Sequence, residues 1–286
     1  MAEKMVGVIG GSGLYEMEGL EDVQTISLTT PFGAPSDSFV VGRVEGTKVA
    51  FLPRHGKGHR ISPSSLNFRA NIYAMKVLGV QSIIGVSAVG SMKESLHPGD
   101  MVIPDQYIDR TVHRQNTFFS DGVVCHISFA DPVCPTLSQI IYEAGKEVGA
   151  NVHKGGTYLC IEGPQFSTRA ESKLYRTWGV DVIGMTNLPE ARLAREAEIC
   201  YATIAFVTDY DCWHEEEADV SIGEVLRILA QSTKIAKRAI RNAIPKLPEK
   251  RECFCSTALK HALITGKKHI PEKTKKDLEP IIGKYL

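Results

Sequence analysis

The chain lacks an excess of charge of either sign. Its 286 residues contain 33 Lys and Arg against 33 Asp and Glu, which gives a formal net charge of +0 at pH 7. Proteins that coat nucleic acid or bind membranes through a polybasic surface need an excess of cations, so we expect neither partner. A small anionic ligand is still compatible with this balance, because one arginine and a few backbone N–H groups are enough to hold it.

The chain also lacks a long hydrophobic run. No window approaches 18 uninterrupted apolar residues, so the sequence predicts no membrane-spanning helix. The first apolar run ends in glycines after a few residues, and no signal peptide is expected. The 7 cysteines are an odd number, and a chain of this size needs no disulfides to bury a core. We therefore expect a cytoplasmic protein whose thiols are mostly reduced.

Two cysteines, Cys253 and Cys255, are separated by one residue. A structural zinc site would need a second pair of ligands, and the nearby sequence offers only His261. The sequence therefore predicts no metal.

Two familiar phosphate-binding motifs are missing. The glycine-rich turn at residues 10–13 departs from the dinucleotide pattern G-x-G-x-x-G, because Glu16 stands where the third glycine would be. No G-K-[ST] follows it, so the P-loop of nucleotide triphosphatases is excluded as well.

Short apolar runs alternate with patterns of helical spacing. The runs that indicate strands cover residues 5–9, 48–52, 81–86, 101–103, 180–185 and 200–207. The helical patterns cover residues 66–78, 135–148 and 171–178. Strands that alternate with helices are typical of an α/β fold whose sheet is covered on both faces.

One more helix is predicted to start at Ser221. Ser221 and Glu224 have the spacing of a capping box, and Pro245 and Pro248 end the unit. The apolar stripe along this helix consists of Ile222, Val225, Leu226 and Leu229. Such a stripe is more often core than binding surface.

The composition of the chain changes after this helix. We expect residues 1–248 to form one α/β domain and residues 249–286 to form a lysine-rich C-terminal extension with a short helical pattern at 257–264. The extension has three open interpretations: a cover for a pocket, a cover for a subunit face, or a solvated tail.

Several predicted strands end in groups that can bind an anion. The glycines around Ser12 let backbone N–H groups approach an anion, and the guanidinium of Arg54 offers a planar fork beside His55. Small hydroxyl-bearing endings follow at Ser87-Ala88 and at Thr186. Ligands of parallel α/β sheets sit at the carboxyl ends of the strands, so we expect one anion site here.

The strand at 200–207 leads into two carboxylates instead. Asp209 and Asp211 stand at i and i+2, which places them on one face of an extended segment. An Asp-rich turn or a magnesium site is the alternative, although a site already supplied with anion donors needs no cation. Phe166 follows a Gly-Pro turn and can stack on a planar ring, with a core phenylalanine as the alternative.

Taken together, six motifs resemble the methylthioadenosine phosphorylase branch of the purine nucleoside phosphorylase family. They are GVIGGSGL, TPFGxPSD (30–37), PRHGxxH (53–59), IEGPxFSxRAES (161–172), GMTNLPE (184–190) and TDYDCW (208–213). The resemblance runs from about residue 5 to 245 and fades after Pro248. The Cys253-x-Cys255 pair beyond it is similar to one that forms a disulfide in some thermophilic archaeal relatives.

The resemblance implies a single-domain α/β fold with a central mixed β-sheet flanked by helices. It implies phosphorolysis of 5′-methylthioadenosine to adenine and 5-methylthioribose 1-phosphate. Inorganic phosphate is then a co-substrate and no cofactor is needed. It also implies a homotrimer or homohexamer in which a neighbouring subunit completes the site. The alternatives are a phosphorylase of broader or 6-oxopurine specificity, a nucleosidase that uses water, and a non-catalytic nucleoside-binding protein.

The family's site residues map onto this chain position by position. The implied phosphate contacts are Ser12, Arg54, His55, Ser87, Ala88 and Thr186. Met185 matches the residue against the ribose, and the purine pocket is matched by Phe166, Ser167, Asp209 and Asp211. The implied pocket for the 5′ substituent consists of Ile222, Val225 and Leu226, together with His126 from the neighbouring subunit.

Asp209 is the expected catalytic residue. A carboxyl that donates a proton to purine N7 must hold that proton near neutral pH, which requires a raised pKa. A dry pocket and the nearby carboxylate of Asp211 are the expected causes. The sister branch specific for 6-oxopurines carries Glu and Asn where Ser167 and Asp209 stand, so this chain is expected to favour adenine.

Overall fold

The computed structural model describes residues 3–214 and 222–286, except for the side chains of Ser12, Tyr15, Ile222 and Glu224. The predicted capping box of Ser221 and Glu224 therefore lies outside the described residues. Within the described ranges, no helix is both long and apolar enough to cross a membrane.

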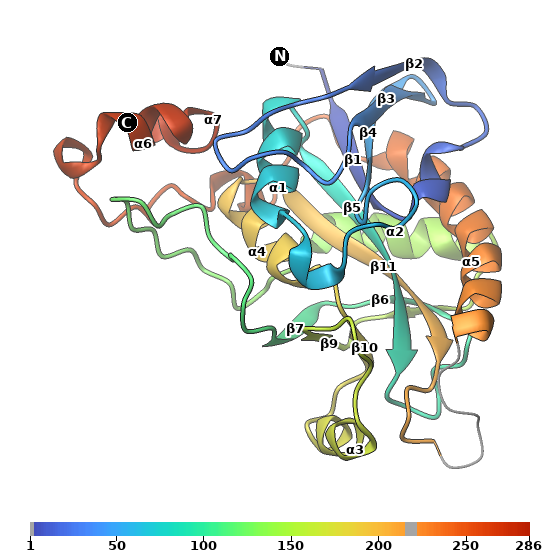
Figure 1. The fold of residues 1–286 in the computed structure, drawn as a ribbon. Helices are drawn as coiled ribbons and strands as arrows, with labels where there is room; N and C mark the ends of the chain where they lie inside the picture. The colour runs from blue at the N-terminus through green and yellow to red at the C-terminus, as the bar shows by residue number, and fades with distance from the viewer. Residues whose placement is uncertain (1–2, 215–221) are drawn as a thin grey trace.

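A mixed, 11-stranded sheet forms the centre of the described chain (Figure 1). Its main path runs in the order β2 (Glu21–Ile26), β3 (Phe39–Val44), β4 (Thr47–Pro53), β1 (Met5–Gly10), β5 (Ser82–Ser91), β10 (Val182–Gly184), β9 (Thr157–Ile161), β7 (Gln106–Arg110). The remaining strands branch from β5 in the order β11 (Cys200–Asp209), β6 (Met101–Ile103), β8 (Val152–Lys154). The parallel centre, in which β1 pairs with β4 and β5, and β5 with β11, confirms the predicted α/β class.

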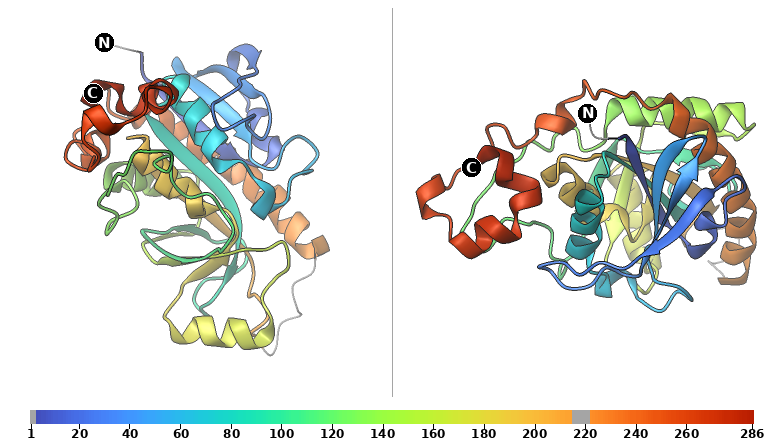
Figure 2. Two further views of the ribbon diagram at one scale, coloured as in Figure 1. Left: turned by 60° about the vertical axis from the view of Figure 1, so that its left-hand side comes forward. Right: turned by 90° about the horizontal axis from the view of Figure 1, so that it is seen from above.

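Helices cover both faces of this sheet (Figures 1 and 2). One face carries α1 (Phe68–Val77) and α4 (Asn187–Glu196), and the other carries α2 (Pro135–Glu147) and α5 (Ile222–Ala243). Shorter helices are α3 (Arg169–Thr177), α6 (Glu272–Asp277) and α7 (Glu279–Ile282). Single 3-10 turns occur at Ser12–Tyr15, Pro63–Ser65, Ile244–Lys246, Phe254–Thr257, Lys267–His269 and Gly283–Tyr285.

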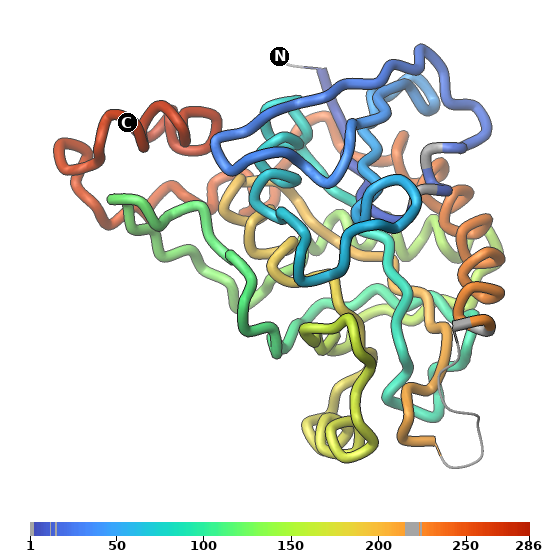
Figure 3. Tube along the Cα trace, viewed as in Figure 1, coloured from blue at the N-terminus to red at the C-terminus, as the bar shows by residue number. Residues whose placement is uncertain are grey.

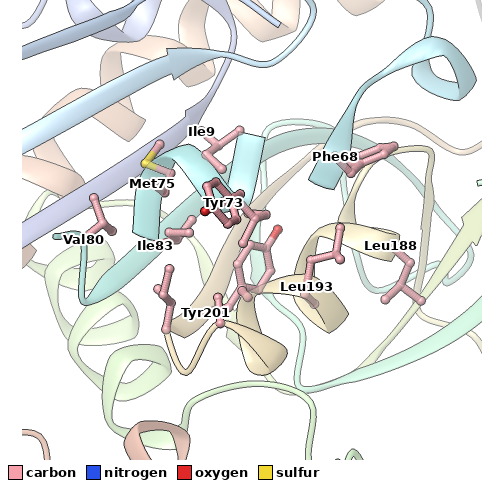
Figure 4. Packing of buried hydrophobic residues seen from close by; sticks show 14 of the residues in the cluster. Ile9, Phe68, Tyr73, Met75, Val80, Ile83, Leu188, Leu193 and Tyr201 are labelled. Atoms are coloured by element: carbon pink, nitrogen blue, oxygen red, sulfur yellow. The ribbon is translucent and has the colours of Figure 1, made fainter. Parts of the chain in front are cut away.

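The alternation of side chains along β1 explains why two cores form. Met5 and Ile9 point to the face of α1 and α4, whereas Val6 and Val8 point to the face of α2 and α5. Successive strand residues alternate between faces, so a continuous apolar run can feed both cores. Figure 4 shows the first core, where Ile9 and Ile83 from the sheet meet side chains of α1 and α4.

The C-terminal segment, residues 249–286, packs into the first core. Its buried side chains there are Leu259, Ala262, Ile270, Leu278, Ile281 and Ile282. The middle of the segment lies beside the 111–130 region (Figure 3), where the hydroxyl of Thr274 donates a hydrogen bond to the carbonyl of Asp121 at 2.7 Å. The lysines lie among these anchored apolar residues, so this segment is packed against the α/β fold.

Three sequence predictions differ from the structure. The pattern at 257–264 forms a 3-10 turn and further turns, because apolar spacing reports which side chains are buried and not which dihedrals the backbone adopts. The strand predicted at 81–86 continues through Ser87 and Ala88 to Ser91. The sequence patterns did not indicate β2, β3, β7, β8, β9 or α4.

Candidate active site

A fork in the sheet creates the principal cavity of the described chain. On one edge of β5, β1 pairs with Ser82 to Gly85 and β10 pairs with Gly90 and Ser91. Between these two partners, residues 86–89 have no strand neighbour on that edge within the described residues. A cavity of about 550 Å³ opens there and is lined by residues 86–90 of β5.

Arg54 forms part of the cavity wall directly after β4. It is only 2% exposed, and its Nε and Nη2 donate to the carboxylate of Glu190 at 2.8 and 2.9 Å. Nη1 donates to the carbonyl of Val86 at 2.9 Å, and Nη2 also reaches the carbonyl of Ile9 at 3.3 Å. The guanidinium of Arg54 was expected to bind an anionic ligand, but two of its nitrogens are paired with the carboxylate of Glu190. Four N–H groups are used, which leaves one on Nη1 for another acceptor.

Two hydroxyls in the cavity wall are available to a ligand. Ser87 Oγ and Thr186 Oγ1 are buried, and no described residue forms a hydrogen bond with either. A buried polar group without a partner costs about 1–3 kcal/mol, so native structures rarely keep one without a reason. Both positions were predicted to contact phosphate. Ala88 also lines the cavity, and so do Gly11 and Gly13 on either side of Ser12.

His55 lies beside Arg54 with a fixed tautomer. Its Nδ1 is 2.9 Å from the carbonyl of Ile61, and a carbonyl only accepts, so Nδ1 carries the proton. Burial, followed by the charge of Arg54, lowers the pKa of His55 to about 4. The ring is therefore neutral at pH 7, and its Nε2 is a hydrogen-bond acceptor. His59 stacks on it with ring centroids 4.3 Å apart and also lines the cavity.

The two carboxylates lie where β11 ends. The carboxylate of Asp209 accepts hydrogen bonds from Thr208 Oγ1 at 2.7 Å and from the N–H of Asp211 at 2.8 Å. Burial raises the pKa of Asp209 despite these two bonds. Burial also raises the pKa of Asp211, and the charge of Asp209 adds to that effect. Of the two causes expected for Asp209, burial raises its pKa, and the charge of Asp211 is not among the causes.

The backbone of β5 makes room for this carboxylate. A Cβ at Gly90 would lie 2.9 Å from Asp209 Oδ1, closer than carbon and oxygen atoms normally approach. Among the residues that the structure describes, Asp209 and Asp211 are not part of any group of three or more metal-ligating side chains. Both carboxylates line the cavity and both have a raised pKa, which suits an acid that interacts with a ligand.

Apolar side chains close the rest of the cavity. Met185, Val225 and Leu226 line it as predicted, while Phe166 is 46% exposed and so is not a core residue. The carbonyl of Met185 accepts a hydrogen bond from the buried Arg114 at 2.7 Å, which fixes this part of the wall.

Two of the predicted residues, Ser167 and His126, are not among the residues that line the cavity. The hydroxyl of Ser167 is buried without a partner among the described residues, but Ser167 does not line the cavity, because the chain turns toward α3 there. His126 is exposed in the 111–130 region, where its N–H donates to the carbonyl of Ala262. The side chains of Ser12 and Ile222 lie outside the described part of the chain.

Sequence reasoning missed several lining residues. They include Leu14, His59, Val86, Gly90, Ile161, Ile183, Thr208, Leu229 and Thr233. His59 had a usable signal, because it closes the PRHGxxH motif, and Leu229 belongs to the predicted stripe of α5.

Comparison with known proteins identifies the family. The description "Phosphorylase superfamily" matches residues 5–245. The S-methyl-5′-thioadenosine phosphorylase of Geobacter sulfurreducens is 61% identical over 285 residues, which cover 99% of this chain and 100% of that protein. The S-methyl-5′-thioadenosine phosphorylase of Koribacter versatilis is 54% identical over 281 residues, which cover 98% and 96%. The chain belongs to the methylthioadenosine phosphorylase family of this superfamily.

Solved structures of the family have the same fold. A methylthioadenosine phosphorylase sourced from an antarctic soil metagenomic library superposes with a TM-score of 0.93 at 48% identity, covering 98% of this chain and 99% of that chain. A methylthioadenosine phosphorylase from Schistosoma mansoni in complex with adenine gives a TM-score of 0.83 at 34% identity, covering 98% of each chain. The nucleoside-phosphorylase-like fold that the motifs indicated is confirmed.

Proposed function

We propose that the chain cleaves 5′-methylthioadenosine with inorganic phosphate and releases adenine and 5-methylthioribose 1-phosphate. The observation that carries this proposal is the composition of one cavity. It joins two buried hydroxyls that have no partner among the described residues to two carboxylates of raised pKa and to an apolar wall from α5. The names of the relatives at 61% and 54% identity support the same reaction.

The phosphate is held by groups around the fork in the sheet between β1 and β10. The hydroxyls of Ser87 and Thr186 donate to its oxygens, and the remaining N–H of Arg54 adds a charged donor. Neutral His55 has Nε2 as an acceptor, which suits the single O–H of monohydrogen phosphate. Because Glu190 already pairs with Arg54, the cation is held in place before phosphate arrives. Such preorganised charge costs no reorganisation during the reaction.

Bond cleavage separates charge between sugar and purine. The glycosidic bond between C1′ and N9 breaks, a bond from C1′ to a phosphate oxygen forms, and the purine leaves with a proton gained at N7. Asp209 supplies that proton, since burial raises the pKa of its carboxyl. A carboxyl oxygen of Asp211 accepts a hydrogen bond from the 6-amino group of the purine. A positioned acid of this kind contributes about 10²–10⁴-fold to the rate.

The methylthio group is proposed to lie against α5. Val225, Leu226 and Leu229 share one apolar stripe of that helix, and all three line the cavity. Leu226 is 58% exposed in the single chain, so its face is free to meet a ligand or a second chain. An apolar pocket of this kind discriminates by about 1–3 kcal/mol per methylene-sized change, so adenosine is expected to be a poorer substrate.

We also propose a homotrimer or homohexamer in the cytoplasm. Support comes from the exposure of Phe166 and Leu226 at the mouth of the site, where a neighbouring chain would bury them. His126, exposed on a loop away from its own cavity, would then serve the adjacent site. No cofactor is proposed, because phosphate and the side chains of the cavity supply every group that this reaction needs.

The decisive experiment follows release of the purine base by absorbance, with and without phosphate; the base is adenine for the two adenine nucleosides and hypoxanthine for methylthioinosine. Methylthioadenosine, adenosine and methylthioinosine are compared at equal concentrations. We expect turnover that depends on phosphate and is fastest with methylthioadenosine. Equal turnover without phosphate would show a nucleosidase, and a preference for methylthioinosine would show a 6-oxopurine enzyme. Either result overturns the proposal.

A further inference from the structure

Four cysteines from three distant parts of the chain meet at the far end of the sheet from Asp209. Cys134 precedes α2, Cys200 begins β11, and Cys253 and Cys255 lie at the start of the C-terminal segment. Their Sγ atoms all lie within 4.8 Å of one another. Cys200 Sγ and Cys253 Sγ are 3.3 Å apart.

This arrangement has the dimensions of a tetrahedral metal site. Zinc–sulfur bonds of about 2.3 Å place the four sulfurs of a tetrathiolate about 3.8 Å apart. One observed separation is 3.3 Å and none exceeds 4.8 Å, which is compatible with that value. Three of the four cysteines are buried and Cys253 is half-buried, as in structural sites where four protein ligands leave no open position. We propose that Cys134, Cys200, Cys253 and Cys255 bind one structural zinc ion.

The surroundings suit the charge of such a site. Four thiolates around Zn²⁺ carry a net charge of −2, so nearby cations and N–H groups stabilise it. Arg251 Nη1 lies 4.0 Å from Cys200 Sγ, and the carbonyls of Gln81 and Glu198 hold that guanidinium in place. Cys134 is the N-cap of α2, a helix of 13 residues whose first N–H groups favour negative charge.

A small cavity adjoins the cluster. It has a volume of about 20 Å³ and is lined by three of the cysteines, by Lys4 and by Arg251. The role of the ion follows from what it would connect. It ties the C-terminal segment to β11 and to the start of α2, immediately before that segment enters the core at Leu259. Folding of the segment is therefore coupled to metal binding.

Sequence alone could not indicate this site. The second pair of ligands comes from Cys134 and Cys200, whereas the search near the Cys253-x-Cys255 pair offered only His261, which is exposed and outside the cluster. A disulfide is the competing chemistry for the same sulfurs. It joins them in pairs and needs an oxidant, whereas the mutual approach of all four is what one central ion requires.

The test measures metal in the full-length protein. The chain is purified without chelators or metal-affinity resin from cells grown with added zinc, and zinc per chain is measured by mass spectrometry. We expect about one zinc ion per wild-type chain, and less than about a tenth of that in Cys253→Ser/Cys255→Ser. Cys125→Ser, which changes a cysteine outside the cluster, should keep the metal.

Two further measurements guard against misfolding and adventitious binding. Cobalt substituted into the wild-type protein should give the intense visible absorption of a tetrahedral tetrathiolate, which no surface site reproduces. Cys200→Ser provides a second, independent loss of the metal if the double variant fails to fold. Wild-type protein without zinc, with these four sulfurs recovered as disulfides, would overturn the proposal. So would zinc that remains in both cluster variants.

Discussion

Replacing Glu190 by Gln tests how the cation of the active site is held. Glu190 is fully buried and accepts hydrogen bonds from Arg54 Nε, Arg54 Nη2 and the hydroxyl of Tyr201, at 2.8, 2.9 and 2.7 Å. Glutamine keeps the shape of the side chain but removes its charge. Arg54 cannot lose its proton at ordinary pH, so the variant leaves a buried cation without its counter-charge.

The size of the effect follows from this burial. Removing one partner of a buried ion pair costs about 3–5 kcal/mol, and large domains lose about 2–4 °C in Tm per kcal/mol. We therefore expect the Tm of Glu190→Gln to fall by roughly 6–20 °C. Glu45→Gln is the matched control, because Glu45 pairs with Arg241 at 2.7 Å while both side chains are almost half exposed. Such pairs contribute about 0–1 kcal/mol, or less than ~4 °C.

Phosphate gives the assay a second readout. Scanning calorimetry compares wild type and both variants with and without saturating phosphate. An anion bound next to Arg54 supplies part of the missing counter-charge, so phosphate should raise the Tm of Glu190→Gln more than it raises that of wild type. If Glu190→Gln had the same Tm as the Glu45→Gln control, the reasoning would be refuted.

Three more outcomes are expected. Asp209→Asn should lower kcat about 10²–10⁴-fold with a smaller change in KM, measured by adenine release; near-normal kcat would exclude Asp209 as the acid. The pKa of His55 falls from 6.5 to about 4 on folding, so its contribution to stability is complete above pH 6.5 and is lost as pH falls toward 4. Urea unfolding at neutral and acid pH should therefore show a larger loss for wild type than for His55→Gln, and parallel losses would contradict this. Leu226→Asn should raise KM for methylthioadenosine about tenfold and leave that for adenosine nearly unchanged; an equal rise for both would place the methylthio group elsewhere.

Much of the framework was predictable because burial leaves a clear pattern in sequence. The apolar runs at β1, β4 and β11 are continuous, and such runs indicate strands covered on both faces. The end of β5 was not predictable in the same way. Ser87 and Ala88 are small and suit a turn as well as a strand, and only the pairing with β11 up to Gly90 decides between them.

The site was predictable in its residue types but not in its contacts. Arg54 was expected to grip an anion, yet the partner that engages its fork, Glu190, lies 136 positions further along the chain. No local pattern reports such a contact. The same limit applies to Cys134 and Cys200, whose meeting with the C-terminal cysteines depends on how α2 and β11 pack.

The fork between β1 and β10 has a consequence for what this protein admits. An unpaired strand edge normally invites another polypeptide to add a strand, which leads to aggregation. Here the open edge of residues 86–89 lies inside a cavity of about 550 Å³, with Arg54 bonded to the carbonyl of Val86. Because β5 is an interior strand of the sheet, its unpaired stretch faces the ligand cavity and is not an outer edge to which a second chain could add a strand.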